Sequence, residues 1–394
     1  MSSEACTKAS AARGAWAAPM PLSPEAARKL VEESLLATAQ LGREVAVPGG
    51  RAYLAPGVEL GADRPFVCAI GAFDGLHLGH RALVAAARED AHRRGVPLAV
   101  VTFDPDPAEV LSSRSPERLL QDEDRVRALA SLGPDAVVVH DFTRSFSQLG
   151  YEAYVKDVLS AAARPVSLHV GTNFTMGRGG AGSPTDLAAL GERMGFDVTG
   201  HDLVADGGEA VSATRVRRLL RAGGEDGLAT AARLLGRCPY VRGVVEHGRG
   251  EGTGFGFPTA NVTLDPRDCV PAQGVYACWY VGEDGRAWSA AVNVGEPPTF
   301  STDARPMLEA NLVGFSGDLY GATARVVFVR WLRGSRRFDS LEELERTVLG
   351  NIDWVRQNLG GSCVEVPACA EGPACVGAGS APTTSEAGGH GGRP

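Results

Sequence analysis

From residue 66 onward, short apolar runs alternate with longer stretches in which apolar residues recur at helical spacing. The runs have the length of buried strands, and the stretches between them have the length of helices. The expected strands cover residues 66–70, 98–103, 136–139 and 166–170. The expected helices cover residues 81–94, 123–132, 151–162 and 187–194, the first ending at Gly95. This repeat predicts an α/β domain with a parallel, doubly wound sheet.

The pattern changes near Gly236. Beyond it, short segments of alternating apolar and polar residues are separated by glycine and proline. These segments cover residues 240–246, 274–280, 289–294, 307–313 and 323–331. Their spacing predicts a small antiparallel β-barrel. A closing helix is expected to start after Ser340, its N-cap, and to run to about Leu359.

The two ends of the chain differ from the regions between them. Residues 1–60 are expected to form an N-terminal extension, with residues 1–22 disordered and a helix beginning at Ser23-Pro24-Glu25. Residues 361–394 are rich in glycine, alanine, proline and serine, which predicts a disordered tail. Two domains remain, residues 61–235 and 236–360. Neither end has a phosphate-binding pattern, so residues 60–362 are expected to suffice for chemistry.

Composition excludes several classes of protein. The 394 residues are 44% hydrophobic and 22% charged, as in ordinary globular proteins. The net charge is −8 and no basic stripe stands out, so we expect no nucleic-acid partner. No apolar run is long enough for a membrane span or a signal peptide, so we expect a cytoplasmic protein without a membrane partner. Eight cysteines do not form a disulfide framework, and the spacing of Cys363, Cys369 and Cys375 is not that of a zinc site.

A glycine-rich stretch, GAFDGLHLGH at residues 71–80, follows the first expected strand. A turn between a strand and a helix presents backbone N–H groups and the positive end of the helix dipole to phosphates. The candidate phosphate-binding residues are Gly71, Phe73, Asp74 and Gly75. His77 and His80 can face the same ligand and donate hydrogen bonds to its oxygens. The stretch resembles the His-x-Gly-His signature of nucleotidyltransferases, which implies a Rossmann-like fold and catalytic roles for His77 and His80.

A second stretch, VSATRVR at residues 211–217, resembles the other signature of that superfamily. Ser212 and Thr214 would offer hydroxyl groups to the triphosphate, and Arg217 a fixed cation. Residues 100–107 and 171–177 narrow the resemblance to the adenylyltransferase half of bacterial bifunctional riboflavin kinase/FAD synthetases. This resemblance implies that residues 61–235 are the FMN adenylyltransferase domain and that Asn173 binds the flavin.

A third stretch, GRGEGTGFGFPTAN at residues 248–261, lies in the barrel half. Its glycines let the backbone approach phosphates. The phosphate-binding candidates are Gly248, Gly252, Gly254 and Gly256. Thr259 and Asn261 offer neutral oxygens to a Mg²⁺ ion that is already bound by phosphates. The last six residues resemble the riboflavin kinase signature, and residues 291–300 and 308–312 follow in the family order. The resemblance implies that residues 236–360 are the kinase domain and that Glu309 is its catalytic base.

The resemblance covers residues 64–359 and implies a bifunctional enzyme. The barrel would convert riboflavin and ATP to FMN, and the α/β domain would convert FMN and ATP to FAD and pyrophosphate, with Mg²⁺ serving both reactions. These small molecules are the implied partners, and the oligomeric state stays open. Two alternatives remain: a riboflavin kinase with an inactive adenylyltransferase half, and a flavin-binding module without turnover. The sequence departs from the usual family residues at Asp106, Ala213, Thr253, Asn311 and Ser335.

Overall fold

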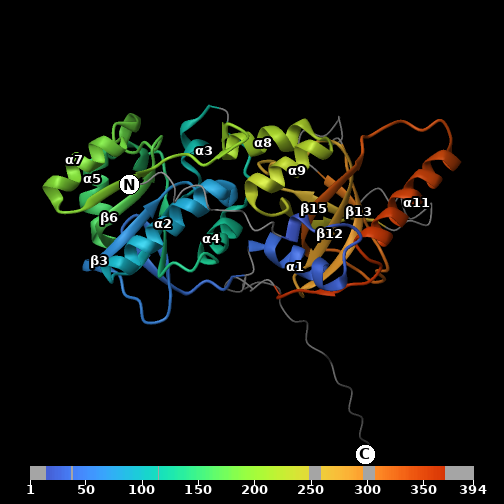
Figure 1. Cartoon of the computed structure of the whole chain (residues 1–394), viewed down its shortest axis with the longest axis horizontal. Helices are drawn as coiled ribbons and strands as arrows, with labels where there is room; N and C mark the ends of the chain where they lie inside the picture. The colour runs from blue at the N-terminus through green and yellow to red at the C-terminus, as the bar shows by residue number, and fades with distance from the viewer. Residues whose placement is uncertain (1–14, 37–38, 114, 248–258, 296–306, 369–394) are drawn as a thin grey trace, which may run out of the picture.

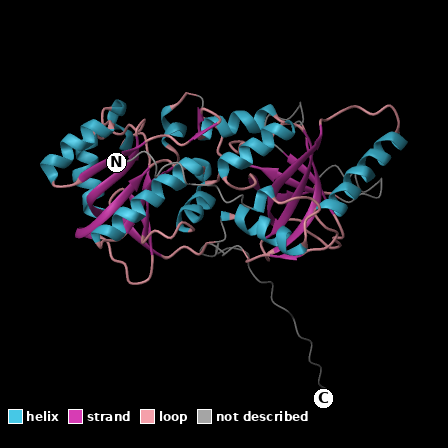
Figure 2. Cartoon of the chain, viewed as in Figure 1, coloured by secondary structure: helices cyan, strands magenta, loops and turns pink. Residues whose placement is uncertain are grey.

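The computed structural model describes residues 15–36, 39–113, 115–247, 259–295 and 307–368. These residues form two halves that lie side by side (Figure 1). Figure 2 shows helices around a sheet in the first half and mostly strands in the second. The arrangement confirms the expected fold class, an α/β domain followed by an antiparallel barrel with a helix.

The α/β half contains a seven-stranded sheet. In sheet order, the strands are β1 (Arg43–Val47), β2 (Gly50–Leu54), β5 (Ala136–Asp141), β4 (Leu98–Asp104), β3 (Gly61–Ile70), β6 (Ala163–Gly171) and β7 (Asp197–His201). The last five in this order are parallel, whereas β2 joins β5 antiparallel. The β1–β2 hairpin therefore belongs to this sheet, although it lies in the stretch expected to be an extension. The sequence pattern did not reveal it because β1 is short and has no fully buried residue.

Helices cover both faces of this sheet. One face of β3, including Val67 and Ala69, packs in the same core as α2 (Leu78–Arg94) and α4 (Asp122–Ala130). The other face of β3 packs against α7 (Pro184–Met194) and against a helical stretch at residues 151–162. That stretch consists of α5 (Tyr151–Ala153), η5 (Tyr154–Leu159) and α6 (Ser160–Ala162). The α7 helix begins three residues earlier than expected because Ser183 and Asp186 form a capping box.

The order of the strands places a topological switch point beside β3. Strand β4 lies on one side of β3, and β6 lies on the other. The chain therefore continues from β3 to β4 in one direction across the sheet and from β6 to β7 in the opposite direction. In open parallel sheets, ligands bind at such a switch point, outside the carboxyl ends of the strands. Gly71 directly follows β3, and Asn173 lies two residues beyond β6. Both predicted site residues therefore belong to the same edge of the sheet.

The second half is a closed barrel of six strands. In chain order these are β10 (Tyr240–Glu246), β11 (Ala260–Leu264), β12 (Gly274–Gly282), β13 (Arg286–Val294), β14 (Met307–Leu312) and β15 (Thr323–Arg333). The barrel closes because β12 pairs with both β13 and β15. The closing helix, α11 (Leu341–Asn358), is capped as expected, since the Ser340 hydroxyl accepts a hydrogen bond from Glu343 N. A short β16 (Val364–Glu365) adds to β13.

Smaller elements complete the fold. Between the halves lie α8 (Ala213–Ala222) and α9 (Gly224–Leu235), which share a core with the barrel interior. The short elements are η1 (Ala15–Ala17), η3 (Asp74–Leu76), α3 (Pro107–Leu111), η4 (Phe146–Gln148), η6 (Arg178–Gly180), β8 (Ala205–Asp206) and β9 (Glu209–Ala210). The sequence pattern did not reveal α9, which is rich in alanine and leucine and follows α8 across the single residue Gly223.

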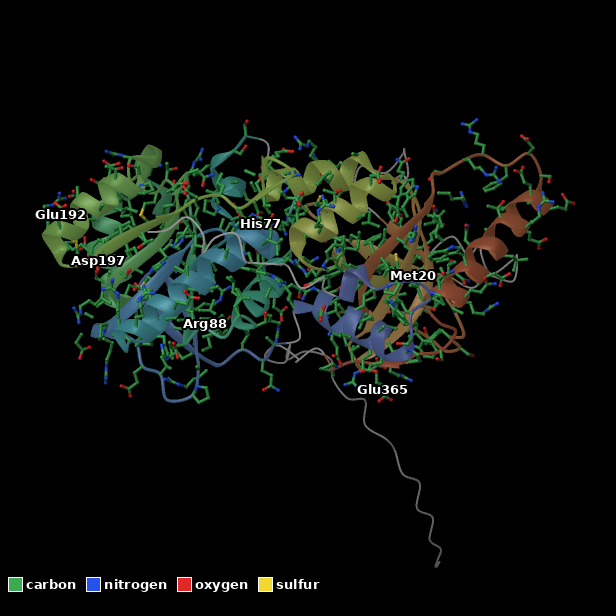
Figure 3. The ribbon with its side chains drawn as sticks, viewed as in Figure 1. Met20, His77, Arg88, Glu192, Asp197 and Glu365 are labelled. Carbon is green, nitrogen blue, oxygen red and sulfur yellow. The ribbon has the colours of Figure 1, made fainter. Side chains whose placement is uncertain are left out.

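The N-terminal helix α1 (Pro24–Ser34) packs against the barrel half, where it contacts β16, and not only against the α/β half that follows it in sequence. Figure 1 shows α1 beside β12, and Figure 3 places Met20 over the same half, away from Glu192 and Asp197. Leu30 and Val31 are buried in one core with Trp279. The Ser23 cap is confirmed by its hydrogen bond from Ala26 N. The expectation that residues 60–362 suffice for chemistry stays a prediction, and it requires the barrel half to keep its fold after α1 is removed from this core.

Candidate functional site

The first candidate site is built on the turn between β3 and α2. Phe73, Gly75 and Leu76 all have positive φ angles, of 57°, 72° and 42°. Gly75 cannot be replaced without rearrangement, since a Cβ atom there would lie 2.6 Å from Leu119 Cδ1. This succession of left-handed residues reverses the chain sharply after the strand. It brings His77 to the N-cap of α2, so the helix begins at Leu78, three residues before the start expected from the sequence pattern.

His77 and His80 face each other across the first turn of α2. Their rings stack with centroids 3.6 Å apart, and the edge of His80 contacts Phe73. His77 Nδ1 accepts a hydrogen bond from His80 N at 3.3 Å, which leaves the proton of a neutral ring on Nε2. Burial lowers the pKa of His77 to about 4, with further lowering by Arg237 and Arg217. Burial and His77 hold the pKa of His80 well below its usual value. Both imidazoles are thus neutral near pH 7.

Asp74 and Arg217 are 143 residues apart in sequence and form a buried ion pair. The Asp74 carboxylate also accepts hydrogen bonds from the backbone N–H groups of Leu119 and Leu120. Arg217 Nε donates to Glu117 O at 2.6 Å. These contacts occupy the side chains of Asp74 and Arg217, two residues that the sequence suggested for binding phosphate. In this structure the pair holds the turn against residues 117–120.

The second signature lies beside the first. Ser212 caps α8 and accepts a hydrogen bond from Arg215 N, and Thr214 is exposed in the first turn of that helix. A Cβ atom on Gly79 would lie 3.7 Å from Val211 O, so the starts of α2 and α8 approach each other closely. Asn173 is exposed beyond the end of β6. The structure thus brings two helix N-termini and two histidines to one side of the sheet edge.

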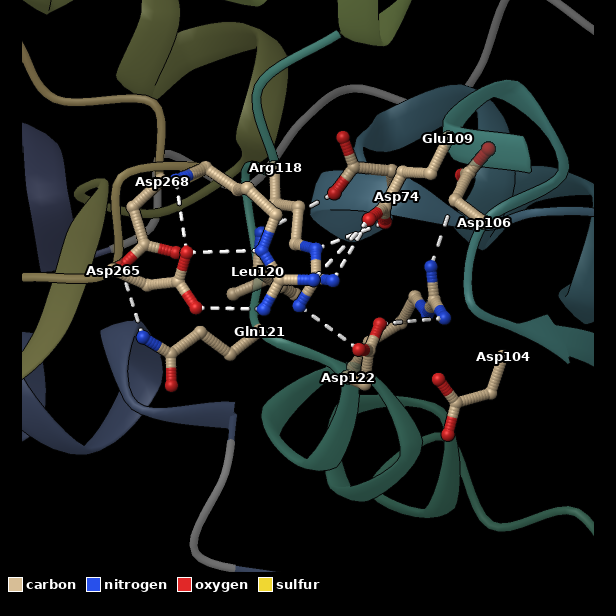
Figure 4. A network of polar contacts seen from close by, with 12 residues as sticks. Asp74, Asp104, Asp106, Glu109, Arg118, Leu120, Gln121, Asp122, Asp265 and Asp268 are labelled. Atoms are coloured by element: carbon tan, nitrogen blue, oxygen red, sulfur yellow. Dashed lines mark hydrogen bonds and ion pairs between the residues drawn. The ribbon is translucent and has the colours of Figure 1, made fainter. Parts of the chain in front are cut away.

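A network of ionic contacts lies next to this site (Figure 4). Arg118 binds the Glu109 carboxylate through two nitrogens, at 2.9 and 2.8 Å, and pairs with Asp122. Gln121 donates to the Asp268 carboxylate of the barrel half at 2.8 Å. Burial raises the pKa of Asp268 to about 6. This network was not anticipated, because it joins residues from both halves of the chain.

The same network includes Asp106, one of the positions at which the sequence departs from the family pattern. Its carboxylate caps α3 by accepting a hydrogen bond from Ala108 N at 2.8 Å, and it lies 3.7 Å from the Arg125 guanidinium. The aspartate therefore has a structural partner in this protein.

The second candidate site is a row of polar side chains across three barrel strands. Asn261 on β11 is in register with Glu309 on β14, which is in register with Asn293 on β13. Their neighbours along each strand, such as Val262, are buried in the barrel, so the row lies on its outer surface. Asn293 Nδ2 donates to Glu309 Oε2 at 3.2 Å. Asn293 belongs to the family-like segment at residues 291–300 but was not among the predicted site residues, because the role of an asparagine in a strand depends on the register of its neighbours.

A cleft of about 300 Å³ opens beside this row, between the barrel and α11. That volume suits a small-molecule ligand. Its polar lining includes Thr259, Asn293, Glu309, Asn311, Arg333, Ser335 and Asn351, and its apolar lining includes Val275, Phe338, Leu344, Val348 and Ile352. Thr259 and Glu309, predicted from sequence, thus line one cleft. Gly248, Gly252, Gly254 and Gly256 lie outside the described residues, and so does Thr253.

Comparisons with known proteins match each half of the chain to a family. A family model for FAD synthetase matches residues 60–215, and one for riboflavin kinase matches residues 235–359. The bifunctional riboflavin kinase/FMN adenylyltransferase of Escherichia coli (strain K12) is 37% identical over 283 residues, covering 72% of this chain and 89% of the relative. The relative of the same name in Bacillus subtilis (strain 168) is 32% identical over 296 residues, with 72% and 89% covered.

A solved structure described as a macrolide-efflux protein from Streptococcus pneumoniae has a similar fold. The TM-score is 0.66 at 27% sequence identity, over 76% of this chain and 96% of that chain. Within the described part of this chain, no helix has the length and apolar character needed to cross a membrane. The chain belongs to the family of bifunctional riboflavin kinase/FMN adenylyltransferases, with FMN made from riboflavin and ATP in the C-terminal half and FAD made from FMN and ATP in the N-terminal half.

Proposed function

We propose that His77 and His80 bind the triphosphate of ATP as neutral hydrogen-bond donors during adenylyl transfer. The nucleophile in this step, the phosphate of FMN, is already an anion and needs no base. The reaction requires alignment and stabilisation of the charge that develops on the leaving pyrophosphate. The Nε2–H group of His77, the turn at Gly71, Phe73, Asp74 and Gly75, and the N-terminus of α2 supply donors for that charge.

The start of α8 faces the same ligand in this proposal. Ser212 and Thr214 contribute hydroxyl groups. Arg217, which is held in place by its ion pair with Asp74, contributes its positive charge. Asn173, beyond β6, contacts the flavin. Support comes from the meeting of these residues at the switch point of the sheet, where a nucleotide and a second substrate can lie in line.

Glu309 is the proposed base of the kinase step. The nucleophile there is a neutral hydroxyl of riboflavin, which must lose a proton as it attacks the γ-phosphorus of ATP. Glu309 is exposed at the cleft, and the amide of Asn293 orients its carboxylate from the neighbouring strand. The position of Glu309 between Asn261 and Asn293 is the observation that supports this role most directly.

Thr259 and Asn261 are the proposed protein ligands of Mg²⁺. A hydroxyl, an amide oxygen and the nearby Glu309 carboxylate are hard oxygen donors of the kind that Mg²⁺ accepts. Among the described residues, no cluster of three or more histidine, cysteine or acidic side chains could hold a metal ion. An ion that arrives with the phosphates of ATP needs few ligands from the protein. When bound, Mg²⁺ neutralises charge on the phosphate oxygens.

The test is Glu309→Gln, which keeps the size of the side chain and removes the base. FMN formation from riboflavin should fall by about 10²–10⁴-fold. With FMN supplied directly, FAD formation should stay within about twofold of the parent rate, because that step needs no base. The products are separated by chromatography and quantified.

Glu365→Gln, at an exposed strand glutamate on β16, is the matched control and should leave both rates unchanged. Kinase turnover that survives in Glu309→Gln would show that Glu309 has a structural role only.

A further inference from the structure

Arg237 follows α9 and lies at the start of the barrel half, inside the segment matched by the riboflavin kinase family. Its side chain is buried, with 2% of the residue exposed. The guanidinium does not turn toward the kinase cleft. Instead, Nη2 donates to Gly75 O at 2.8 Å, and Nη1 lies 3.5 Å from Leu76 O and 3.4 Å from Leu235 O. A residue of the kinase half thus binds the turn that carries the histidines of the other half.

The turn needs this support because of its backbone geometry. Leu76 has a φ of 42°, which is unfavourable for a residue with a branched side chain, and it is completely buried. A buried carbonyl without a hydrogen-bond donor is costly, and Arg237 supplies a donor to Gly75 O. The positions of Gly75 and Leu76 in turn fix the direction in which His77 begins α2.

The junction is also tightly packed. Gly236 ends α9 with a φ of 69°, and a Cβ atom there would lie 2.9 Å from Leu78 Cδ2 at the start of α2. The positive charges of Arg237 and of Arg217, on α8, both act on His77, and the ring of His80 stacks on it. Burial, and after it the two arginines, lower the pKa of His77, which keeps its Nδ1 free to accept the hydrogen bond from His80 N.

We propose that Arg237 is a positioning residue for FMN adenylyl transfer, through which the kinase half completes the active site of the adenylyltransferase half. It contacts the carbonyl oxygens behind the turn, and the histidines on the turn contact the nucleotide. The inference rests on the roles proposed above for His77 and His80.

The experiment uses the full-length chain with Arg237→Gln and Arg237→Lys. The glutamine variant should reduce kcat for FAD formation from FMN by about 10–100-fold, with the KM values for ATP and FMN changing much less. Riboflavin phosphorylation in the same variant should stay within about twofold of the parent, which also shows that the chain is folded. Lysine keeps the charge and one donor, so its kcat should lie between those of the parent and the glutamine variant. If Arg237→Gln does not fold, the lysine variant alone supplies the test.

A pH profile separates positioning from general support of the fold. Removing the charge of Arg237 should move the acid limb of kcat for FAD formation to higher pH, since His77 then protonates more readily. The lysine variant should keep the limb of the parent. Superimposable profiles for the parent and Arg237→Gln, with unchanged kcat, would overturn the proposal.

Arg242→Gln is the matched control, because Arg242 also joins the halves, through Glu123 and Asp124, but does not touch the turn. An equal loss of FAD formation in Arg242→Gln would overturn the proposal by showing that any loosening of the interface has this effect. His80→Ala separates the role proposed for the histidines from the role proposed for Arg237. If it leaves FAD formation intact, the proposed role of the histidines fails; if it reduces FAD formation while Arg237→Gln does not, only the role of Arg237 fails.

Discussion

At the scale of single residues, buried histidines determine how the α/β half responds to acid. His140 is completely buried at the end of β5, where its ring stacks on Phe146 and meets the edge of Tyr154. Burial lowers the pKa of His140 to about 4. The unfolded chain binds this proton near the ordinary pKa of about 6.5. The contribution of neutral His140 to the free energy of unfolding is therefore fully present above about pH 6.5. It is lost progressively as the pH falls toward the folded-state pKa.

We predict that His140→Phe makes the protein less sensitive to acid, because phenylalanine fits among the aromatic rings and takes up no proton. Between pH 7.5 and pH 5, the variant should lose about 2 kcal/mol less unfolding free energy than the parent. Denaturant unfolding at the two pH values measures this difference. Replacing His92, which is exposed on α2, by glutamine is the control and should leave the parent's pH dependence unchanged. The same pH dependence in His140→Phe and the parent would contradict the argument.

At the scale of elements, α1 shows the difference between predicting a helix and predicting its partner. The Ser23 cap and the following proline indicated the start of the helix correctly. The residues on its apolar stripe gave no sign that β12, about 240 residues later, is the surface they cover. Any apolar surface of suitable shape could have been the partner, since hydrophobic burial is not directional.

We predict that Leu30→Ala destabilises the protein by about 2–5 kcal/mol, because it leaves a cavity between α1 and the barrel. Leu30 is 1% exposed, whereas the neighbouring Lys29 has an exposed side chain with 67% accessibility. Lys29→Ala on the same helix is thus a control and should change stability by less than about 0.5 kcal/mol. Thermal unfolding followed by circular dichroism compares the two variants. Equal midpoints for Leu30→Ala and the parent would show that α1 is only loosely attached.

At the scale of the whole molecule, an ionic cluster connects the two catalytic halves. Asp124 on α4 is 1% exposed, and its Oδ1 lies 3.1 Å from Arg242 on β10 and 3.1 Å from Arg325 on β15. Removal of one member of a buried ion pair is strongly destabilising, because the remaining charge keeps its desolvation cost. This cluster and the hydrogen bonds of Gln121 and Arg237 make the halves one connected body.

We predict that Asp124→Asn weakens the coupling of the halves and lowers stability by about 3–5 kcal/mol. In calorimetry, the single transition expected for the parent should move to lower temperature and broaden or divide in two. Glu123→Gln is the matched control, because Glu123 binds the same Arg242 from a more exposed position, 43% accessible. A change in Asp124→Asn no larger than that in Glu123→Gln would show that the buried carboxylate does not hold the halves together.

Features that depend on neighbouring residues could be predicted from the order of the amino acids. Strand and helix alternation, the caps at Ser23 and Ser340, and the stop at Gly95 follow from local backbone chemistry. The stretch at residues 71–80 indicated a nucleotide site because glycines and histidines at this spacing have few structural explanations. The two-domain division and the family also followed from motifs within short segments.

The contacts between residues far apart in sequence could be known from the folded chain alone. Asp74 binds Arg217 and the backbone of Leu119 and Leu120, Asn293 orients Glu309, and Arg237 supports the turn at Gly75. An arginine or an asparagine has the same appearance in sequence whether it is solvated, paired or buried. Its role is set by strand register, by burial and by the group placed opposite, and these are properties of chain segments brought together by folding.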